Sequence, residues 1–445
     1  MQSLFFFLGA LALLIIIHEY GHFWVARRCG VKVLRFSVGF GKPIWRKLGA
    51  DGTEYVLAPI PLGGYVKMLD EREGAVPEAE LGSAFNRQSL AKRCAIVVAG
   101  PVANLLFAVL AYWFLFVVGI PGIKPIVAEV EPASIVAEAG LVGGDQIIQV
   151  DDRDTPTWNA VFKALLIHAE QGGHTTMLVS SGGTQHRVDI DVPQLAMEEG
   201  GQLLNRLGIT PLRPDIAPVI GKVVAGSPAQ RAGLEVGDRL LAADGRTIDT
   251  WSGWVELIQQ QVDQTMLISV ERQGETRELT LTPEAGENGR GRIGAAVDSD
   301  FSELPAALKA ELRYGPVSGL SEAVVQTWRF STTVLKSLSG MLTGQVSTEN
   351  LGGPISIAQI AGSSAEQGML SFVSFLAMIS ITLGVLNLLP IPMLDGGHLA
   401  MFLIEAVRGK PLSETVQIKG QQIGLFLLLM LMFLAFFNDL SRLFG

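Results

Sequence analysis

The chain has 445 residues, of which 49% are hydrophobic and 17% are charged, and its formal net charge is −9. This composition is typical of a membrane protein with soluble parts, and the lack of a basic stripe with interleaved aromatic side chains argues against nucleic acid as a partner. The two cysteines, Cys29 and Cys94, exclude a disulfide framework, and we interpret both as reduced thiols.

The first predicted element, within residues 1–27, is a transmembrane helix over Leu4–Ala26 that contains His18-Glu19-Tyr20-Gly21-His22. On a helix, the H-E-x-x-H spacing puts two imidazoles on one face, where they can share a zinc ion, and the glutamate can act as the general base of a metalloprotease. Charged groups at membrane depth cost roughly 2.5–3.5 kcal/mol each, yet two of the six histidines lie there. The motif therefore predicts a hydrolytic zinc site inside the membrane.

A secretory signal peptide is the alternative interpretation of this segment. The first 26 residues contain no Lys or Arg, so a basic n-region is missing, and no small-x-small cleavage site follows the apolar run. We therefore expect a retained transmembrane segment.

Residues 28–92 are predicted to form a cytoplasmic, membrane-associated β region. Twelve Lys or Arg lie between residues 27 and 93, and the positive-inside rule assigns such a loop to the cytoplasm. Segments 34–41, 54–58 and 61–68 show two-residue alternation or Gly-rich turns, which predicts short strands. The resulting sheet is either a stabilising hairpin alone or a sheet whose edge strand holds an extended substrate by β-addition.

The second predicted span, at about 96–118 within residues 93–120, is followed by a duplicated region. The motif A-G-L-x-x-G-D occurs at 139–145 and again at 232–238, an offset of 93 residues. A repeat of that length indicates a duplicated domain, and we expect the two copies at 121–212 and 213–300. The second copy is predicted to contain a helix over Trp254–Gln261, followed by strands over Met266–Arg272 and Arg277–Leu281.

The duplicated pattern resembles bacterial PDZ domains, and the resemblance implies two tandem PDZ-like α+β domains. PDZ domains bind peptides by adding them to a sheet edge, but a likeness of fold does not establish a ligand. Two interpretations are therefore open for this pair: it binds a peptide ligand, or it is only a spacer or a filter that blocks access of bulky substrates.

The remainder of the chain is predicted to return to the membrane. Residues 301–369 are expected to form a connector of amphipathic helices, with apolar faces at Leu304–Leu312 and Val324–Leu342. The third span is predicted at about 372–394, within residues 370–407, and the fourth at about 423–437, within residues 408–445. With the basic loop in the cytoplasm, this topology puts the duplicated domains outside and the zinc site near the cytoplasmic face.

A catalytic zinc ion takes three protein ligands and keeps an open position for water, so a ligand beyond His18 and His22 is needed. The third span ends in N-x-x-P-x-P-x-L-D-G-G-H at 387–398. Asp395 is the best candidate because a carboxylate completes a common zinc ligand set, and His398 is its rival. A helix N-cap is the structural alternative for Asp395.

Other polar and helix-breaking residues lie in the same stretch. Pro390 and Pro392 interrupt regular helix, which a membrane tolerates only in a protein-lined site. Asn387 could hold a substrate backbone or a developing oxyanion.

The H-E-Y-G-H motif at 18–22 and the N-x-x-P-x-P-x-L-D-G-G motif at 387–397 together resemble the site-2 protease family of intramembrane zinc metalloproteases. The resemblance covers essentially the whole chain. The resemblance implies that His18, His22 and Asp395 bind one zinc ion per chain and that Glu19 activates the attacking water. It also implies that residues 39–41 and 63–68 form the membrane-associated sheet near the site. Because the Gly/Pro-rich loops around Gly63 and Pro390 are suited to trap an extended strand, the predicted substrate-binding residues are Gly39, Phe40, Gly41, Gly63, Gly64, Tyr65, Val66, Asn387, Pro390 and Pro392.

The implied fold is a polytopic α-helical membrane protein with four transmembrane segments, a membrane-associated β-sheet and two tandem PDZ-like α+β domains. The implied activity is hydrolysis of a peptide bond within the transmembrane segment of single-pass membrane proteins. An anti-sigma factor like RseA, already cut on its outer side, is the implied partner in regulated intramembrane proteolysis of the envelope stress response. The implied location is the bacterial inner membrane, with the PDZ-like domains in the periplasm.

Two other functions are compatible with parts of the pattern. The chain could be a non-catalytic membrane adaptor whose PDZ-like pair recruits proteins while a zinc ion is structural, but such a site needs no base and usually has four closed ligands. It could also be a metal transporter, since intramembrane His and Asp mark ion paths, but the duplicated domains and the lack of further ligands along a path argue against this. Glu19 therefore favours the protease.

Overall fold

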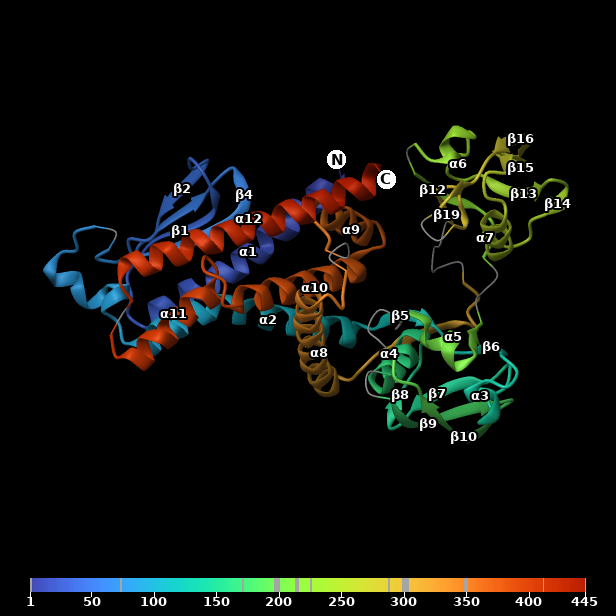
Figure 1. Cartoon of the computed structure of the whole chain (residues 1–445), viewed down its shortest axis with the longest axis horizontal. Coiled ribbons are helices and arrows are strands. Elements are labelled where there is room, and N and C mark those ends of the chain that lie inside the picture. Colours follow the sequence, from blue (N-terminus) through green and yellow to red (C-terminus); the bar gives the residue numbers. More distant parts are fainter. Residues whose placement is uncertain are drawn as a thin grey trace. The chain divides into compact units, whose positions relative to one another are not determined.

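The computed structural model describes residues 2–444 apart from 73, 170–171, 196–200, 213–215, 225, 287–288, 298–303, 348–350 and 411. The chain divides into two compact units, one formed by Met1–Ile120 with Arg313–Gly445 and the other by Pro121–Leu312 (Figure 1). The first, the membrane unit, contains the apolar helices, and the second, the repeat unit, contains the duplicated region. The expected domain boundaries at residues 213, 300 and 301 lie outside the described residues.

Among the described residues, four helices are long and apolar enough to cross a membrane. They are α1 (Gln2–Arg28), α2 (Leu90–Val118), α10 (Met369–Leu388) and α12 (Glu414–Phe444). Each exceeds or matches the roughly 20 residues that a hydrocarbon core requires. The four predicted spans are therefore confirmed as helices, although α2 and α12 begin several residues before their apolar runs.

Helix α2 packs against both α1 and α10 because small residues allow close approach at the contacts. A Cβ on Gly21 of α1 would overlap the backbone carbonyl of Ala99, so only glycine fits at this crossing. On the other side, Ser380 of α10 donates a hydrogen bond to the backbone oxygen of Asn104 at 2.9 Å. The three helices thus form one packed core around α2.

The third span is shorter than predicted. Helix α10 ends at Leu388, and the next residue, Leu389, is extended, as expected for a residue that precedes proline. A turn over 389–394 follows, and α11 (Asp395–Arg408) begins a new, short helix. The predicted continuation of the span to residue 394 is therefore wrong, because the two prolines end the helix earlier.

The loop between α1 and α2 contains a four-stranded sheet in the order β2-β3-β1-β4. Its strands are β1 (Val33–Phe40), β2 (Trp45–Leu48), β3 (Glu54–Leu57) and β4 (Ile60–Met68), and the short helices η1 (Glu78–Ser83) and η2 (Phe85–Arg87) follow. The three predicted strands are confirmed, whereas β2, which is exposed along its whole length, was not predicted.

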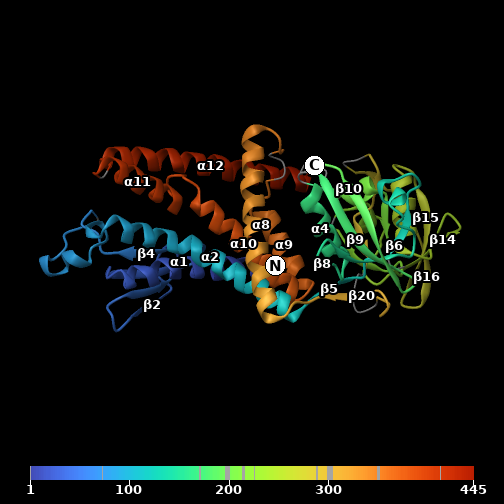
Figure 2. The same ribbon diagram turned by 90° about the horizontal axis from the view of Figure 1, so that it is seen from below.

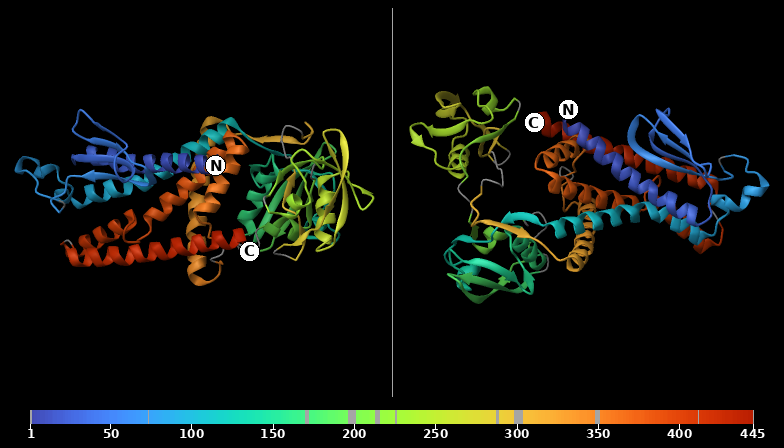
Figure 3. Two further views of the ribbon diagram at one scale, coloured as in Figure 1. Left: turned by 90° about the horizontal axis from the view of Figure 1, so that it is seen from above. Right: turned by 180° about the vertical axis from the view of Figure 1, so that it is seen from behind.

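The position of β4 in this sheet matters for the site. It pairs with β1 in an antiparallel ladder, with Ser37 opposite Tyr65 and Val38 opposite Gly64. Since β4 stands last in the strand order, it is an edge strand, and it packs against α1 (Figure 3). An edge strand presents backbone N–H and C=O groups to a further strand.

The connector to the third span differs in part from the prediction. The stretch Leu304–Leu312 is not a helix, because Lys309–Leu312 forms β20, which pairs with β5 (Ile120–Ile123). The second predicted stretch lies inside α8 (Pro316–Thr343), which runs across the direction of α2 and α10 (Figures 1 and 2). Local apolar spacing favoured a helix at 304–312, but pairing between distant segments decided the outcome.

Helix α9 (Pro354–Glu366) lies between α8 and the third span in the chain and packs against the fourth span, α12. Its first backbone N–H groups point at Asp439 of α12, which accepts hydrogen bonds from Gly353 at 3.0 Å and Ile355 at 2.8 Å. A carboxylate at a helix N-terminus satisfies donors that have no partner within the helix. Asp439 thereby fastens α12 to α9.

In the repeat unit, the first repeat has a sheet in the order β10-β9-β7-β8 and a two-stranded β6-β11 pair. Its elements are β6 (Val127–Val130), α3 (Ile135–Glu138), β7 (Gln146–Val150), β8 (Arg153–Asp154), α4 (Trp158–Ala169), β9 (Gly173–Ser181), β10 (Thr184–Val192), α5 (Leu203–Leu207) and β11 (Ile209–Pro211). A core of its own includes Ile147, Leu165 and Met177.

The second repeat has a sheet in the order β14-β13-β15-β16, with the two-stranded pairs β12-β19 and β17-β18. Its elements are β12 (Ile220–Val223), α6 (Pro228–Arg231), β13 (Arg239–Ala243), β14 (Arg246–Thr247), α7 (Trp251–Gln260), β15 (Met266–Arg272), β16 (Glu275–Leu281), β17 (Glu284–Ala285), β18 (Gly291–Arg292) and β19 (Ala295–Val297). Its core includes Leu240, Trp254 and Ile268. The predicted helix and strands of this copy are confirmed.

The two repeats agree in detail at the predicted offset. Ser134 and Ser227 each cap a short helix by accepting a backbone N–H three residues on. Asp151 and Asp244 both adopt positive φ, at 51° and 47°, in the turn that follows the first long strand. Residues 93 positions apart thus adopt the same local structure in the two repeats.

Candidate metal centre

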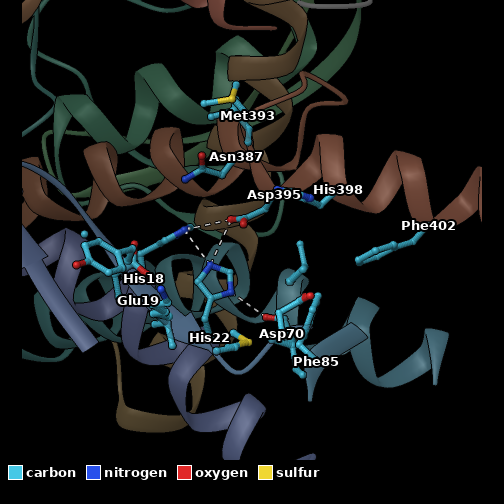
Figure 4. Close-up of a pocket in the computed structure, with 18 of the residues that line it drawn as sticks. His18, Glu19, His22, Asp70, Phe85, Asn387, Met393, Asp395, His398 and Phe402 are labelled. Carbon is cyan, nitrogen blue, oxygen red and sulfur yellow. Dashed lines mark hydrogen bonds and ion pairs between the residues drawn. The ribbon is translucent and has the colours of Figure 1, made fainter. Parts of the chain in front are cut away.

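Three side chains from two helices meet at one point in the membrane unit. His18 and His22 lie on one face of α1, and Asp395 is the first residue of α11. The Nε2 atoms of the two histidines are 3.3 Å apart, and Oδ2 of Asp395 lies 3.1 Å from the first and 3.5 Å from the second (Figure 4). Among the described residues, these three form the group that could hold a metal ion.

The chemistry of these three atoms can be tested against a zinc ion. Nδ1 of His22 lies 2.8 Å from the backbone oxygen of Ile96, which can only accept, so Nδ1 carries the proton and Nε2 offers a lone pair. Oδ2 of Asp395 is buried and receives no hydrogen bond from the described residues. Buried lone pairs that face one another are costly unless a cation lies between them. A two-histidine, one-carboxylate set with an open fourth position fits zinc.

Helix α2 forms the floor beneath the two rings. A Cβ on Gly100 would overlap the rings of His22 and His18, so the helices can cross here only because residue 100 has no side chain. The same helix supplies the Ile96 carbonyl that orients His22. The close crossing of α1 and α2 therefore sets the position of both rings.

Like α1, helix α11, which carries Asp395, makes direct contacts with α2. Arg93 makes a bidentate ion pair with Glu405, with nitrogen–oxygen distances of 2.6 and 3.1 Å. The guanidinium also lies 4.9 Å from the ring centroid of Phe402. A planar guanidinium in such a fork fixes the orientation of its partner, so this pair helps to hold α11 in place.

Glu19 lies beside the three converging atoms and lines the same pocket (Figure 4). The edge strand β4 comes close to it at Gly64, where a Cβ would lie 2.9 Å from Cγ of Glu19 and 2.7 Å from the backbone oxygen of Ser37. Glycine at this strand position permits the close approach. The backbone of an edge strand is thus brought next to the glutamate.

An open pocket of about 660 Å³ surrounds this arrangement. The predicted site residues that line it are His18, Glu19, His22, Gly64, Tyr65, Val66, Asn387 and Asp395. His398 also lines the pocket but does not belong to the group of converging ligand atoms. Of the two rivals for the third position, Asp395 is therefore the one that the structure brings to the histidines.

The other predicted substrate-binding residues do not line this pocket. They are Gly39, Phe40, Gly41, Gly63, Pro390 and Pro392. The Phe40 ring stacks on Tyr65 with a centroid distance of 6.3 Å, so it supports a residue that does line the pocket. Pro392 lies against Gly424 of α12. The substrate-binding role of these six residues stays a prediction.

Sequence reasoning missed Asn104. Its side chain is 1% exposed, and its amide nitrogen lies 3.3 Å from Nδ1 of His18. A signal was available, because Asn104 lies inside the second predicted span and a polar side chain there suggests a functional role. The role of the Ile96 carbonyl could not be predicted in this way, because every residue has a backbone carbonyl whatever its side chain.

The rim of the pocket holds a further carboxylate, Asp70, which accepts hydrogen bonds from Arg72 at 2.9 and 2.5 Å. Burial alone would raise the pKa of Asp70, but the hydrogen bonds from Arg72 outweigh burial and hold the pKa below its ordinary value. Asp70 is therefore ionised and already paired with a cation. This pairing distinguishes it from Asp395.

Comparison with known proteins relates the whole chain to one family. The model of peptidase family M50 matches residues 6–431. The regulator of sigma-E protease RseP of Escherichia coli (strain K12) is 45% identical over 442 residues, which cover 98% of each chain. A putative zinc metalloprotease of Vibrio cholerae is 43% identical over 442 residues, again covering 98% of each chain.

Solved structures match a small part of the chain. The PDZ domain of an SdrC-like protein from Listeria innocua is 20% identical and covers 19% of this chain and 96% of its own, with a TM-score of 0.18. The corresponding domain from Listeria monocytogenes is 18% identical and covers 20% of this chain and 94% of its own, also with a TM-score of 0.18.

Proposed function

The chain belongs to peptidase family M50 and is a zinc metalloprotease of the site-2 protease type, and we propose that His18, His22 and Asp395 hold its zinc ion and that Glu19 is the general base. One observation carries this assignment: three ligand atoms, from residues 18, 22 and 395, lie within 4.8 Å of one another in an open pocket. Glu19 lines that pocket, as a base for the attacking water requires.

The chemistry follows from these positions. When bound, zinc lowers the pKa of a water molecule toward about 7 and polarises the scissile carbonyl. Glu19 takes the proton from the attacking water and later delivers it to the leaving amine. Asn387, at the end of α10 and in the pocket, donates its amide N–H to the substrate oxygen where negative charge develops.

The substrate binds as an extended strand on the outer edge of β4. Two observations support this: β4 is the last strand of its sheet, and Gly64 brings its backbone into contact with Glu19. A peptide bond inside a helix is shielded and hydrogen-bonded, so a transmembrane substrate must unwind before cleavage. Backbone hydrogen bonds to an edge strand replace those lost in unwinding.

The substrate class is a single-pass membrane protein that is cut within its transmembrane segment. The name regulator of sigma-E protease, carried by relatives 45% identical to this chain, supports an anti-sigma factor such as RseA, already cut on its outer side. The basic loop that follows α1 supports a site near the cytoplasmic face of the inner membrane. The two repeats then lie in the periplasm as tandem PDZ-like domains that bind a peptide or exclude bulky substrates.

The test is cleavage of a reporter transmembrane segment by the purified full-length protein. Glu19→Gln keeps the shape of the side chain but removes the base, so we expect it to retain bound zinc and to lose cleavage by at least about 100-fold. Tyr20→Phe is the matched control, because Tyr20 is a neighbour on α1 that is 54% exposed. This variant should cleave like the wild type.

Two results would contradict the proposal. Cleavage by Glu19→Gln at the wild-type rate would remove Glu19 from the mechanism. If the wild type binds zinc but cuts none of a panel of single-pass segments, the non-catalytic adaptor becomes the better account of this chain.

A further inference from the structure

We propose that Asn104 is the positioning residue of His18: its side-chain oxygen accepts the Nδ1 proton of His18 and so turns the Nε2 lone pair toward the metal position. Asn104 would not itself contact zinc or substrate and would act through the ring. The inference rests on the zinc ligands proposed above and adds a residue that contacts one of these ligands.

The contacts hold the amide of Asn104 next to the ring. Asn104 is 1% exposed, and its amide nitrogen as placed lies 3.3 Å from Nδ1 of His18, so the proposal needs the flipped orientation of this amide. The other end is buried and has no hydrogen-bond partner among the described residues. The backbone oxygen of Asn104 accepts a hydrogen bond from Ser380, which fixes this turn of α2 against α10. The ring is therefore the polar neighbour that decides how the amide is turned.

The orientation of the amide follows from what zinc requires of His18. An asparagine amide has nearly the same shape in its two flipped orientations, so hydrogen bonding decides between them. His18 can offer a lone pair at Nε2 only if it is neutral and carries its proton on Nδ1. A buried N–H without an acceptor costs about 1–3 kcal/mol. The amide oxygen must therefore face Nδ1 when the metal is bound.

The two histidines reach the same state by different means. His22 donates its Nδ1 proton to a backbone carbonyl, that of Ile96, at 2.8 Å. His18 depends on a side chain, and a side chain can be changed without moving the helix. Partners of this kind, which fix the tautomer and the orientation of a ligand ring, typically contribute 10–100-fold in metal affinity.

The experiment compares variants of Asn104 that keep its shape, using the full-length protein in detergent and competition with a chelator to measure zinc affinity. Asn104→Leu has no acceptor, and we expect its zinc affinity to fall about 10–100-fold. Asn104→Asp presents acceptor oxygens at both ends, and we expect it to bind zinc at least as tightly as the wild type. Ser380→Ala, which removes the neighbouring hydrogen bond but leaves the amide, should change affinity by less than about threefold.

The outcomes separate the explanations. Wild-type affinity in Asn104→Leu would overturn the inference. Equal weakening in the Leu and Asp variants would also overturn it, because packing rather than an acceptor would then be responsible. If Asn104→Leu does not fold, the Asp variant still decides, since loss of zinc there contradicts the role of an acceptor. A wild type that binds no zinc would instead overturn the ligand assignment.

Discussion

Asp238 of the repeat unit and Asp395 of the membrane unit both have a buried carboxylate oxygen, but the partners of these oxygens differ. In the repeat unit, Asp238 is 0% exposed and receives hydrogen bonds from Arg272 at 2.6 and 2.7 Å and from the N–H of Glu235 at 2.9 Å. In the membrane unit, Oδ2 of Asp395 has no hydrogen-bond donor among the described residues and faces two histidine nitrogens. A fully paired buried carboxylate holds a fold together, whereas an unpaired one leaves room for a cation.

A third carboxylate limits this rule. Asp145 occupies the place of Asp238 in the first repeat and accepts the N–H of Val142, but its Oδ1 has no partner among the described residues. By the register of the strands, Ser181 stands where the second repeat has Arg272. No other ligand atom joins Asp145 in a metal-binding group within the described part of the chain. An unpaired carboxylate therefore indicates a site only when other ligands converge on it.

The largest effect should come from Asp395→Asn, which removes the charge at the converging point. We expect zinc affinity to fall by more than about 100-fold, beyond the effect of an outer partner, and cleavage of a reporter segment to fall with it. Bound zinc measured by mass spectrometry checks the first part. Asp70→Asn is the control, since that carboxylate is already paired with Arg72 and should not affect zinc. If Asp395→Asn retained its zinc, Asp395 would be no more a metal ligand than Asp238 is, and the comparison between the two carboxylates would fail.

The second-largest effect should come from Gly100→Ala, which adds a single methyl group beneath the two histidines. Gly100→Ala places a Cβ where the rings of His22 and His18 lie, so we expect at least about tenfold weaker zinc binding and a stability cost of about 1–3 kcal/mol from overpacking. Gly9→Ala, on α1 where a Cβ meets nothing within 4 Å, should leave zinc binding unchanged and should not lower stability, since alanine favours a helix over glycine. Chelator competition and thermal unfolding of the two variants measure these effects. Equal behaviour of the two would show that the crossing of α1 and α2 does not set the rings.

In the repeat unit, Arg272→Met should lower stability without affecting zinc. It leaves Asp238 buried with only the N–H of Glu235 as a donor among the described residues, and breaking such a buried ion pair costs about 3–5 kcal/mol. Faster hydrogen exchange in 266–281 of the full-length protein would report the loss. Arg277→Met, which removes an exposed arginine from the next strand, should change exchange little. If zinc affinity fell as well in Arg272→Met, the separation between a structural and a functional carboxylate would not hold.

The ion pair between Asp238 and Arg272 also predicts that the stability of the second repeat depends on pH. Burial would raise the pKa of Asp238, but the hydrogen bonds from Arg272 and from the N–H of Glu235 outweigh burial and lower it. The unfolded carboxyl, with a pKa of about 4, therefore binds its proton at a higher pH than the folded one. The stabilisation is complete above about pH 5 and is lost as the pH falls through the lowered value. Hydrogen exchange over this range, corrected for intrinsic rates, should show this loss in the wild type and not in Arg272→Met.

The smallest effect should come from Asp145→Asn. Because this carboxylate has no cationic partner among the described residues, neutralising it should change the stability of the first repeat by less than about 1 kcal/mol. Asp238→Asn should instead cost about 1.5–3 kcal/mol by weakening charged hydrogen bonds. Thermal unfolding or exchange of each repeat compares the two. A larger loss in Asp145→Asn than in Asp238→Asn would reverse the distinction drawn between the repeats.

The site could be predicted from sequence where its parts are local. The pentad fixes His18, Glu19 and His22 on adjacent faces of one helix, and the proline-rich motif singled out Asp395. The contact between Gly64 and Glu19 depends on the register of β4 and its packing on α1, which no local pattern contains. Asn104 could have been identified as a polar residue within a span.

The fold shows the same division. The four spans follow from apolar length alone, and the two repeats follow from a motif that recurs at a fixed offset. The stretch 304–312 was wrongly predicted as helix, because its pairing partner lies in β5, far away in the sequence. The end of the third span was placed too late because its apolar run continues past Pro390, where the backbone cannot remain helical.

The edge position of β4 has a consequence for the pattern of cleavage products. A substrate strand that pairs on this edge, as proposed above, would be held by backbone groups that any sequence possesses, so recognition would select segments that unwind easily more than particular side chains. Because side chains alternate between the two faces of a strand, a slip by one residue exchanges the faces, and a slip by two residues restores them. Imperfect alignment of a substrate should therefore yield fragments whose lengths differ in steps of two residues.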